Sequence, residues 1–236
     1  MTAEEPVPRF AADRPKDIHT ARAWHRYSRY VRVLNRRLEA AARELSLPAG
    51  ARLLDYGCAD TPYRGFFAPG VEYVGADLAG NPLASLTLNP DGSLPAADAS
   101  FDAVLSTQVL EHVADPGLYL SESFRVLRSG GRLLLSTHGI FHYHPDPVDY
   151  WRWTGAGLRR QISEAGFEVT RFEGVFGLAA TGLQLFQDAL HWRLPRPLKT
   201  LLAAVMQPLI SLADRLQSQQ SRDLNASVFV VVARKP

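Results

Sequence analysis

Short apolar runs alternate with helical patterns along most of the chain. The runs have the length of strands, and the stretches between them carry apolar residues every three or four positions. Such alternation predicts an α/β fold with a mainly parallel sheet that helices cover on both faces. The predicted strands are 52–56, 72–76, 102–106, 131–137, 167–173 and 227–233, and the predicted helices between them are 62–67, 116–127 and 154–165.

The N-terminal fifty residues stand outside this alternation. From Thr20 to Leu45, apolar residues recur at spacings of three and four, which predicts a helix with one apolar face. Residues 1 to about 18 are polar and proline-rich, so we expect a flexible arm or a loosely docked lid there. We interpret residues 1–50 as an arm and a lid helix, with Trp24 and Tyr27 facing inward over a site.

About fifty residues before the last strand exceed what a minimal α/β domain needs. The patterns predict helices at 182–192 and 198–216, with a proline-rich break at Pro195-Arg196-Pro197 between them. We expect one domain over residues 51–236, with this helical insertion at about 180–220. A packed cap over the sheet edge or the substrate mouth is the first interpretation, and a dimer interface or a membrane-surface helix are the alternatives.

Composition narrows the possible classes of protein. The chain has 236 residues, 46% of them apolar and 21% charged, which suits one globular domain with additions. A net charge of +2 gives no indication of the strongly basic surface that nucleic-acid binding uses. The single cysteine, Cys58, cannot form an internal disulfide, which is consistent with a reducing cytoplasm. The N-terminus lacks the apolar core of a signal peptide, and no run approaches the about 18 apolar residues of a membrane span.

The first predicted strand ends in an acidic turn that is typical of a nucleotide-cofactor site. Its apolar run breaks at Gly57, and Asp77 ends a second apolar run twenty residues later. The turn departs from the dinucleotide fingerprint because no further glycine follows until Gly65. A pyrophosphate needs bare backbone amides, and the carboxylates of Asp55 and Asp60 would repel it. The turn suits a cationic, phosphate-free nucleoside such as S-adenosylmethionine, and it disfavours a plain dehydrogenase.

Five motifs in order resemble those of class I S-adenosylmethionine-dependent methyltransferases, in the type-11-like small-molecule subgroup. The resemblance covers roughly residues 50–172 and a final strand near the C-terminus. It implies a Rossmann-like, seven-stranded, mostly parallel sheet and S-adenosylmethionine as the cofactor, although the usual third glycine of the first motif is missing. The motifs are Asp55-x-Gly57-x-Ala59, Asp77, Ser100 to Leu105, Gln108-Val109-Leu110-Glu111-His112-Val113 and Arg125 to Gly131.

The resemblance also implies which residues hold the cofactor. The backbone of Gly57, Cys58 and Ala59 would pass close to its methionine part, and Asp55 would reach the ammonium group. Asp77 would accept hydrogen bonds from the ribose diol, with Leu78 packed on the adenine. The far side of the site would be lined by Gln108 and Val109. The alternatives are that Asp55 caps the following helix and that Asp77 is a turn residue.

A second dense patch, from Thr137 to Thr154, follows the predicted strand 131–137. It concentrates aromatic and histidine residues where open α/β sheets bind ligands, beyond the carboxyl ends of their strands. Methyl transfer to a hydroxyl needs alignment and a base near neutral pKa. His144 is the first candidate for that base, ahead of His142 and His138, and Asp149 completes the predicted catalytic set.

The same patch suggests a saccharide or a glycosylated metabolite as the acceptor. Its aromatic rings could stack on a sugar while Asp146, Asp149 and Arg152 hold hydroxyls; alternatively, Arg152 only ties the loop to the domain. The patch resembles, in its character, actinobacterial methyltransferases of methylmannose polysaccharide assembly. The predicted stacking residues are Tyr143, Tyr150, Trp151 and Trp153.

Several alternatives stay open from the sequence. Mg²⁺ could hold a substrate diol through Glu111, His112 and Asp146, because carboxylates suit that ion. The acceptor could instead be a nitrogen or carbon of another small metabolite. A non-catalytic cofactor-binding partner protein would use the segment 182–216 for docking, and a homodimer is possible. A nucleic-acid methyltransferase is disfavoured by the charge balance and by the absence of an Asn-Pro-Pro-Tyr or Asp-Pro-Pro-Tyr motif.

Overall fold

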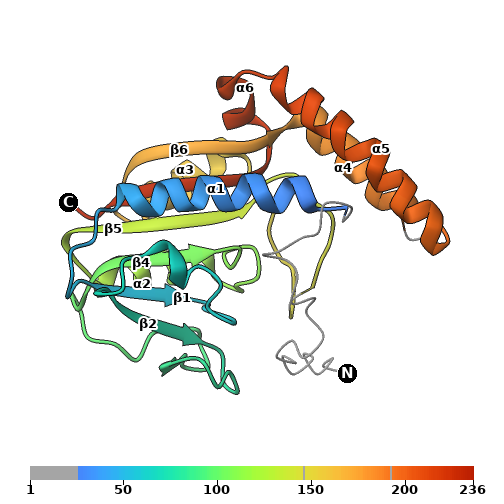
Figure 1. Ribbon diagram of the computed structural model, residues 1–236. Helices are drawn as coiled ribbons and strands as arrows, with labels where there is room; N and C mark the ends of the chain where they lie inside the picture. The colour runs from blue at the N-terminus through green and yellow to red at the C-terminus, as the bar shows by residue number, and fades with distance from the viewer. Residues whose placement is uncertain (1–25, 146, 192) are drawn as a thin grey trace, which may run out of the picture.

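A seven-stranded sheet forms the centre of the molecule in the computed structural model, which describes residues 26–145, 147–191 and 193–236. The strand order is β3-β2-β1-β4-β5-β7-β6 (Figure 1). The strands are β1 (Arg52–Tyr56), β2 (Glu72–Asp77), β3 (Leu86–Thr87), β4 (Phe101–Thr107), β5 (Leu127–His138), β6 (Glu168–Gly177) and β7 (Ala226–Arg234).

Strand direction confirms the predicted, mostly parallel, Rossmann-like sheet. The pairs β1–β2, β1–β4, β2–β3 and β4–β5 are parallel, whereas β7 runs antiparallel between β5 and β6. The arrowheads of β1, β2, β4 and β5 therefore point to one edge of the sheet (Figure 1). Side chains that follow these four strands gather at that edge, which is where open α/β sheets bind ligands.

Helices cover both faces of the sheet. Successive residues of a strand point to opposite faces and both kinds are buried, so each face needs a covering layer. Leu53 belongs to the core under α1 (Ser28–Glu44), whereas the next residue, Leu54, faces the opposite core, under α2 and α3. The core under α1 also takes in residues of α4 and α5, the two insertion helices. The remaining helices are α2 (Pro116–Val126), α3 (Gly155–Glu164), α4 (Leu178–His191), α5 (Arg196–Arg215) and α6 (Gln219–Leu224), with a 3-10 turn, η1 (Arg64–Phe66).

The two helices of the far face begin at side-chain caps. The carboxylate of Asp115 accepts a hydrogen bond from the amide of Leu118 at 3.0 Å, and a proline occupies the first turn of α2. The hydroxyl of Thr154 accepts from the amide of Gly157 at 3.0 Å and starts α3. These caps place α2 and α3 directly after the two segments that build the site described below.

The observed elements differ from the predicted ones in a few places. The short helix expected at 62–67 is only η1, and the strand β3 and helix α6 were not predicted. The first insertion helix begins at Leu178 instead of 182, because α4 starts directly at the end of β6. The N-terminal arm and Trp24 lie outside the described residues, so the expected lid is not tested.

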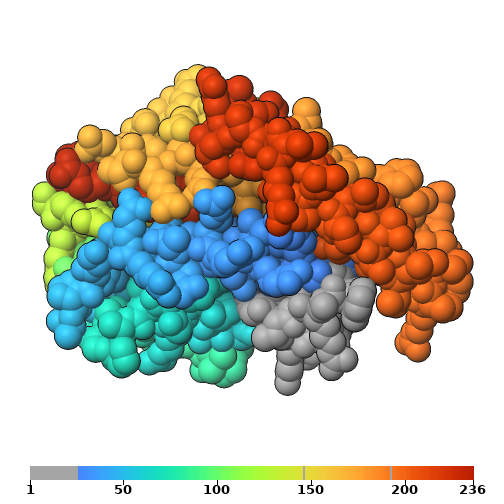
Figure 2. Space-filling view, turned by 45° about the horizontal axis from the view of Figure 1, so that its top comes forward, coloured from blue at the N-terminus to red at the C-terminus, as the bar shows by residue number. Residues whose placement is uncertain are grey.

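The helical insertion leaves and rejoins the sheet at a paired position. Gly177 at the end of β6 stands opposite Ala226 at the start of β7. Between them, α4 and α5 lie side by side and extend beyond the sheet (Figures 1 and 2). Within the described ranges, no helix is both long and apolar enough to cross a membrane.

Candidate functional site

The chain turns sharply after β1 and passes against the segment that follows β4. The amides of Gly57 and Cys58 both donate to the carbonyl of Ala76, at 2.8 and 3.1 Å, which ties the turn to β2. Gly57 has a φ of +85°, and a Cβ there would stand 2.5 Å from Cγ2 of Val109. Only glycine satisfies both the backbone conformation and the close approach.

The turn keeps left-handed backbone where glycine is absent. Ala59 has a φ of +45° and Thr61 a φ of +55°, two and four residues after Gly57. The turn therefore keeps its left-handed conformation without further glycines, at the cost of local backbone strain.

Asp55 is a buried acid with one carboxylate oxygen unpaired. Its Oδ2 accepts a hydrogen bond from the hydroxyl of Tyr73, and its Oδ1 has no hydrogen-bond partner among the described residues. Burial, together with the charge of Asp77, raises the pKa of Asp55 to about 7 against the opposing effect of the hydrogen bond from Tyr73. A cationic donor, such as an ammonium group, would satisfy the free oxygen and restore the ionised form.

Asp77 organises the cofactor turn as well as ending β2. Its Oδ2 accepts from the amide of Ala59 and the side chain of Asn81, both at 2.8 Å, and its Oδ1 accepts from the amide of Leu78 at 2.8 Å. The thiol of Cys58 also lies 4.0 Å from Oδ2, so the acceptor position that remains for a ligand hydroxyl is on Oδ1, which accepts only from Leu78. The side chain of Leu78 is 36% exposed, so its apolar surface remains accessible beside Asp77.

The segment after β4 supplies a second unpaired acceptor. Gln108 has a φ of +56°, and its amide nitrogen Nε2 donates to Oγ of Ser136 at 3.0 Å. Its Oε1 is buried and has no partner in the part of the chain that the structure describes. Two buried acceptors, on Asp55 and Gln108, stand near a turn that carries carboxylates and no basic residue. This donor-seeking, anionic surface fits S-adenosylmethionine and does not fit a pyrophosphate.

The histidine-rich loop after β5 is held together by an arginine–carboxylate pair. Arg152 donates to both carboxylate oxygens of Asp149, at 2.6 and 2.5 Å, and to the carbonyls of Phe141 and His142 at 3.1 and 2.6 Å. The amide of His144 donates to Asp149 at 2.8 Å. Asp149 and Arg152 thus bind each other in this structure, which favours the loop-tying interpretation of Arg152.

The imidazole of His144 is oriented by the same pair. Its Nδ1 lies 3.2 Å from Oδ2 of Asp149 and 3.3 Å from the carbonyl oxygen of His142, and these two acceptors favour a proton on Nδ1 over the competing donor Nη2 of Arg152, which lies 3.4 Å away. Burial lowers the pKa of His144 to about 4, so the ring is neutral at physiological pH. His142 points elsewhere: its ring stacks on Tyr27 at 6.3 Å, and its Nδ1 lies 3.6 Å from Asp188 of α4.

Glu111 and His138 meet at the ends of β4 and β5. Both side chains are buried, and Nε2 of His138 lies 3.5 Å from Oε1 of Glu111. Oε2 of Glu111 accepts from Oγ1 of Thr137 at 2.8 Å, while Oε1 has no hydrogen-bond partner among the described residues. Burial raises the pKa of Glu111 to about 7 and lowers that of His138. Sequence reasoning placed His138 third among the candidate bases and did not connect it to Glu111.

The structure describes two of the three predicted metal ligands, Glu111 and His112, so the predicted set stays a prediction. Nδ1 of His112 lies 2.6 Å from the carbonyl of Val148. Asp146 lies outside the described residues. The groups that do converge on Glu111 are His138 and His144, and one potential ligand atom from each of the three lies within 4.8 Å of the others.

The predicted stacking residues divide into two kinds. Tyr143, Tyr150 and Trp151 are exposed, and Nε1 of Trp151 donates to the carbonyl of Val113 at 2.8 Å. Trp153 instead packs against the core between the sheet and α2 and α3. Its Nε1 is buried without a partner in the described ranges. Three rings therefore remain available at the surface of the loop, and that of Trp151 stacks on Trp153 with centroids 6.1 Å apart.

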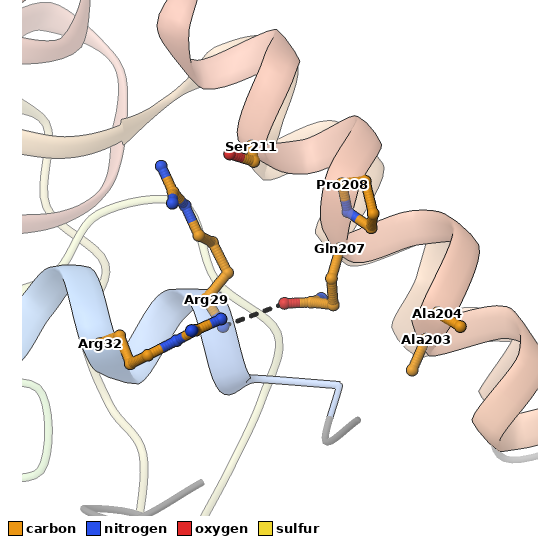
Figure 3. Close-up of a pocket in the computed structure, with 7 residues that line it drawn as sticks. All are labelled: Arg29, Arg32, Ala203, Ala204, Gln207, Pro208 and Ser211. Atoms are coloured by element: carbon orange, nitrogen blue, oxygen red, sulfur yellow. Dashed lines mark hydrogen bonds between the residues drawn. The ribbon is translucent and has the colours of Figure 1, made fainter. Parts of the chain in front are cut away.

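A pocket of about 250 Å³ lies elsewhere, between α1 and α5 (Figure 3). At its base the amide of Arg29 donates to Oε1 of Gln207 at 3.1 Å. All its lining residues come from these two helices, so it shares none with the site at the sheet edge. They are Arg29, Arg32, Ala203, Ala204, Gln207, Pro208 and Ser211.

The sequence of the chain matches a known protein family. Residues 23–171 match the family described as methyltransferase domain. The chain is 40% identical over 89 residues to a probable S-adenosylmethionine-dependent methyltransferase of Mycolicibacterium smegmatis, covering 35% of this chain and 35% of that protein. It is 38% identical over 112 residues to a ubiquinone biosynthesis O-methyltransferase of Cereibacter sphaeroides, covering 40% of this chain and 45% of that protein.

The fold has a solved counterpart as well. The crystal structure of the cyclase SpnF superimposes with a TM-score of 0.57 at 21% identity, over 88% of this chain and 82% of that one. At this level of identity the likeness concerns the fold. The chain spans less than half the length of the curated relatives described above. The family match covers more than half of the chain, including the cofactor turn and the histidine-rich loop, and the chain belongs to the methyltransferase domain family.

Proposed function

We propose that this protein transfers a methyl group from S-adenosylmethionine to a hydroxyl of a small polar acceptor. The observation that carries the proposal is that the cofactor turn and the histidine cluster lie next to each other. The segment from Gln108 to Glu111 links the unpaired acceptors of the cofactor turn to the cluster around His144, at one sheet edge. A cofactor site and a histidine site that share a wall can align two reacting groups.

The chain's own groups divide the work between binding and activation. The cofactor supplies a methyl group on a sulfonium leaving group. Asp55 and Gln108 receive its nitrogen-bound protons, and Asp77 receives a ribose hydroxyl. In the simplest form of the proposal, Nε2 of His144 takes the proton of the acceptor hydroxyl while Asp149 holds Nδ1. A pKa of about 4 makes His144 a weak base, so alignment supplies most of the effect.

We propose a saccharide or a glycosylated metabolite as the acceptor. Support comes from the exposed rings of Tyr143, Tyr150 and Trp151, which belong to the same loop as His144. A phenolic hydroxyl is a second candidate, because relatives named ubiquinone biosynthesis O-methyltransferases share the matched region. Aromatic rings can stack on a sugar and on a phenol alike. The polar groups that hold the hydroxyls of the acceptor would therefore decide between the two.

The first experiment is transfer of a labelled methyl group to a panel of sugars, oligosaccharides and phenols, with and without EDTA. Label on a sugar that is lost in His144→Ala and kept in His191→Ala supports the proposal, since His191 lies at the end of α4. Label on phenols alone would replace the acceptor. Transfer that survives His144→Ala would favour a nitrogen or carbon acceptor, which needs less activation. Inhibition by EDTA would be the sign of a metal, with Mg²⁺ as the ion first considered.

An alternative from another class is a cofactor-binding protein without methyl transfer. One observation supports this alternative. The cyclase SpnF has the same fold, so the fold also occurs in proteins whose reaction is not methyl transfer. Cofactor binding by calorimetry, with no transfer to any acceptor, would favour this alternative. The exposed apolar residues of α5 would then be a docking surface.

We also propose a homodimer and a cytoplasmic location. Support for the dimer is an apolar stripe along α5, where leucine and valine side chains recur on one exposed side. Light scattering coupled to size exclusion tests it, and Leu201→Ser with Leu212→Ser should shift the mass toward the monomer. The single buried cysteine, Cys58, supports the location. The exposed side chains of the stripe are Leu198, Leu201, Val205, Leu209, Leu212 and Leu216.

A further inference from the structure

We infer that Glu111, His138 and His144 form a binding site for a transition-metal ion of the Zn²⁺ type. The ion would activate the acceptor hydroxyl, and this role rests on the proposed function. One ligand atom from each residue lies within 4.8 Å of the others, at the carboxyl ends of β4 and β5. The donor set differs from the one that the sequence suggested, since it contains two imidazoles and neither His112 nor Asp146.

Glu111 presents an oxygen that the protein leaves unpaired. Its side chain is fully buried, with 0% exposure, and Oε2 is already bonded to Thr137. Its backbone carbonyl accepts from the amides of Tyr150 and Trp151, at 2.8 and 3.1 Å, which fixes the residue against the loop. An orphaned carboxylate oxygen in a dry interior is costly unless a cation or a donor meets it.

His138 is fixed so that its second nitrogen faces that oxygen. Its Nδ1 lies 3.2 Å from the hydroxyl of Tyr30, and its ring stacks on Phe141 with centroids 4.0 Å apart. A proton on Nδ1, donated to Tyr30, leaves the lone pair of Nε2 directed at Glu111. Metal-binding histidines commonly donate their other ring nitrogen to an oxygen in this way.

His144 has oxygen atoms behind its ring, as metal-binding histidines commonly do. Its Nδ1 faces the carboxylate of Asp149, whose side chain is 1% exposed and is clamped by Arg152. With Nδ1 engaged, Nε2 is the nitrogen that we assign to the ion. The rings of His138 and His144 approach edge to face, with centroids 4.7 Å apart. A carboxylate behind a histidine orients the ring and raises its strength as a ligand.

The spacing of the donors fits a small ion with four ligands. Atoms bound tetrahedrally at about 2.1 Å from an ion stand about 3.4 Å apart. Nε2 of His138 and Oε1 of Glu111 are 3.5 Å apart, close to that value. The third donor lies within 4.8 Å of the other two, so it needs a shift of up to about 1.4 Å, which rotation of a loop side chain supplies.

The chemistry of the set selects the kind of ion. Two imidazoles and one carboxylate suit Zn²⁺, Co²⁺, Fe²⁺ or Mn²⁺, whereas Mg²⁺ prefers oxygen ligands alone. Three protein ligands leave a position open, as in catalytic metal sites. An acceptor hydroxyl bound there would lose its proton more readily. A metal-bound Nε2 cannot also take a proton, so His144 would activate the hydroxyl as a ligand instead of as a base.

The test measures metal binding directly. Tag-free full-length protein is stripped with a chelator and titrated with Co²⁺, whose visible absorption reports coordination number and ligand type. Zn²⁺ is then added to displace it, and calorimetry gives the stoichiometry. The expected result is one Co²⁺ per chain, with the intense absorption of a four- or five-coordinate site, displaced by one Zn²⁺.

Variants locate the site. Glu111→Gln, His138→Gln and His144→Ala should each weaken Co²⁺ and Zn²⁺ binding at least tenfold, while the control His191→Ala binds as the wild type does. Circular dichroism checks that each variant folds; His144 lies on a loop, so His144→Ala gives a result even if a core variant fails to fold. Wild-type protein that binds no ion, or trio variants that bind normally, overturn the inference. Loss of binding in His112→Ala with His138→Gln unaffected also overturns it.

The inference and the proposed function can fail separately. Metal binding at the trio without methyl transfer to any acceptor leaves the site standing and removes the function. Methyl transfer by chelator-treated protein that retains no metal, measured by elemental analysis, removes the metal from the reaction.

Discussion

Val109 occupies the space that a Cβ on Gly57 would need, with Cγ2 2.5 Å from that position. The contact joins the turn after β1 to the segment after β4, and Gly57 also has a left-handed φ of +85°. Any side chain at Gly57 would therefore push apart the two segments that form the cofactor site and would strain the backbone.

Gly57→Ala should lower stability by about 2–4 kcal/mol, from left-handed backbone strain and overpacking together. Its affinity for S-adenosylmethionine should fall as well. Urea unfolding and calorimetry measure the two effects. Gly65→Ala is the matched control, because a Cβ there meets nothing within 4 Å. A Gly57→Ala protein with normal stability and affinity would remove this contact from the site.

Thr61→Gly should have the opposite effect on stability. Thr61 is β-branched and has a φ of +55°, a backbone conformation that costs a non-glycine residue about 1–2 kcal/mol. Glycine would remove this strain, but its greater freedom in the unfolded chain would cost about 0.5–1 kcal/mol. We expect a gain of up to about 1 kcal/mol. Thermal unfolding of Thr61→Gly beside Thr61→Ala tests it, since alanine keeps the Cβ and should gain less. Equal changes in both variants would contradict the strain.

Asp55 should make the protein's stability depend on pH. Its pKa is about 7 in the folded protein and 3.8 in its ordinary state, so between these values the folded state holds more protons than the unfolded one. Stability from this group is therefore present at low pH and is lost as pH rises through 7. Relative to wild type, Asp55→Asn should gain about 2–3 kcal/mol between pH 5 and pH 8.

The comparison between variant and wild type is essential for that measurement. Glu111 titrates in the same direction, whereas burial lowers the pKa of His138, His142 and His144, which titrate in the opposite direction. These contributions are common to both proteins and cancel in the difference. Urea unfolding at four pH values gives the difference, and a constant gap between the two proteins would show that Asp55 is ionised throughout.

Asp77→Asn should weaken binding of S-adenosylmethionine by about 1.5–3 kcal/mol, the worth of a hydrogen bond to a charged group. Asparagine keeps the size of the side chain while removing the charge that the turn and the ribose would share. Calorimetry on the folded variant measures the change, with the exposed Asp60→Asn as the control. Unchanged affinity in Asp77→Asn would leave Asp77 as a turn residue.

Arg152→Met should release the histidine-rich loop. Removal of the guanidinium leaves the nearly buried carboxylate of Asp149 uncompensated, at a cost on the order of 3 kcal/mol. Hydrogen exchange at the amide of His144, which donates to Asp149, should become faster. Arg160→Met breaks an exposed ion pair with Glu164 at 2.7 Å and should change neither quantity measurably. Equal behaviour of the two variants would mean that Arg152 does not hold the loop.

Strand positions were predictable because the apolar runs of the central sheet are long and bounded by turn residues. β1 agrees with its prediction at both ends, and the caps at Asp115 and Thr154 stand where the predicted helices begin. β3 has only two residues, Leu86 and Thr87, so it has no periodicity to detect. The seventh strand came from the family resemblance and not from the pattern.

The meeting of Asp55, Gly57 and Asp77 at one edge of the sheet was also predictable, since they are near each other in sequence or follow neighbouring strands, and their role toward a cofactor stays a prediction. The convergence of His138 on Glu111 was not, although the strand order places β5 beside β4. It depends on how the chain folds back after Thr107, where no regular element sets the direction. The pairing of Arg152 with Asp149 likewise depends on loop geometry that residue types alone do not fix.

The paired positions of Gly177 and Ala226 give the helical insertion the character of an exchangeable module. Because β6 and β7 are held together by their own ladder, the two ends of the insertion stay fixed whatever lies between them. Helices of other lengths could follow this junction without shifting the strands that carry the cofactor turn, provided that they keep the residues that α4 and α5 contribute to the core under α1. Diversification among relatives would then concentrate in one replaceable segment while the sheet stays constant.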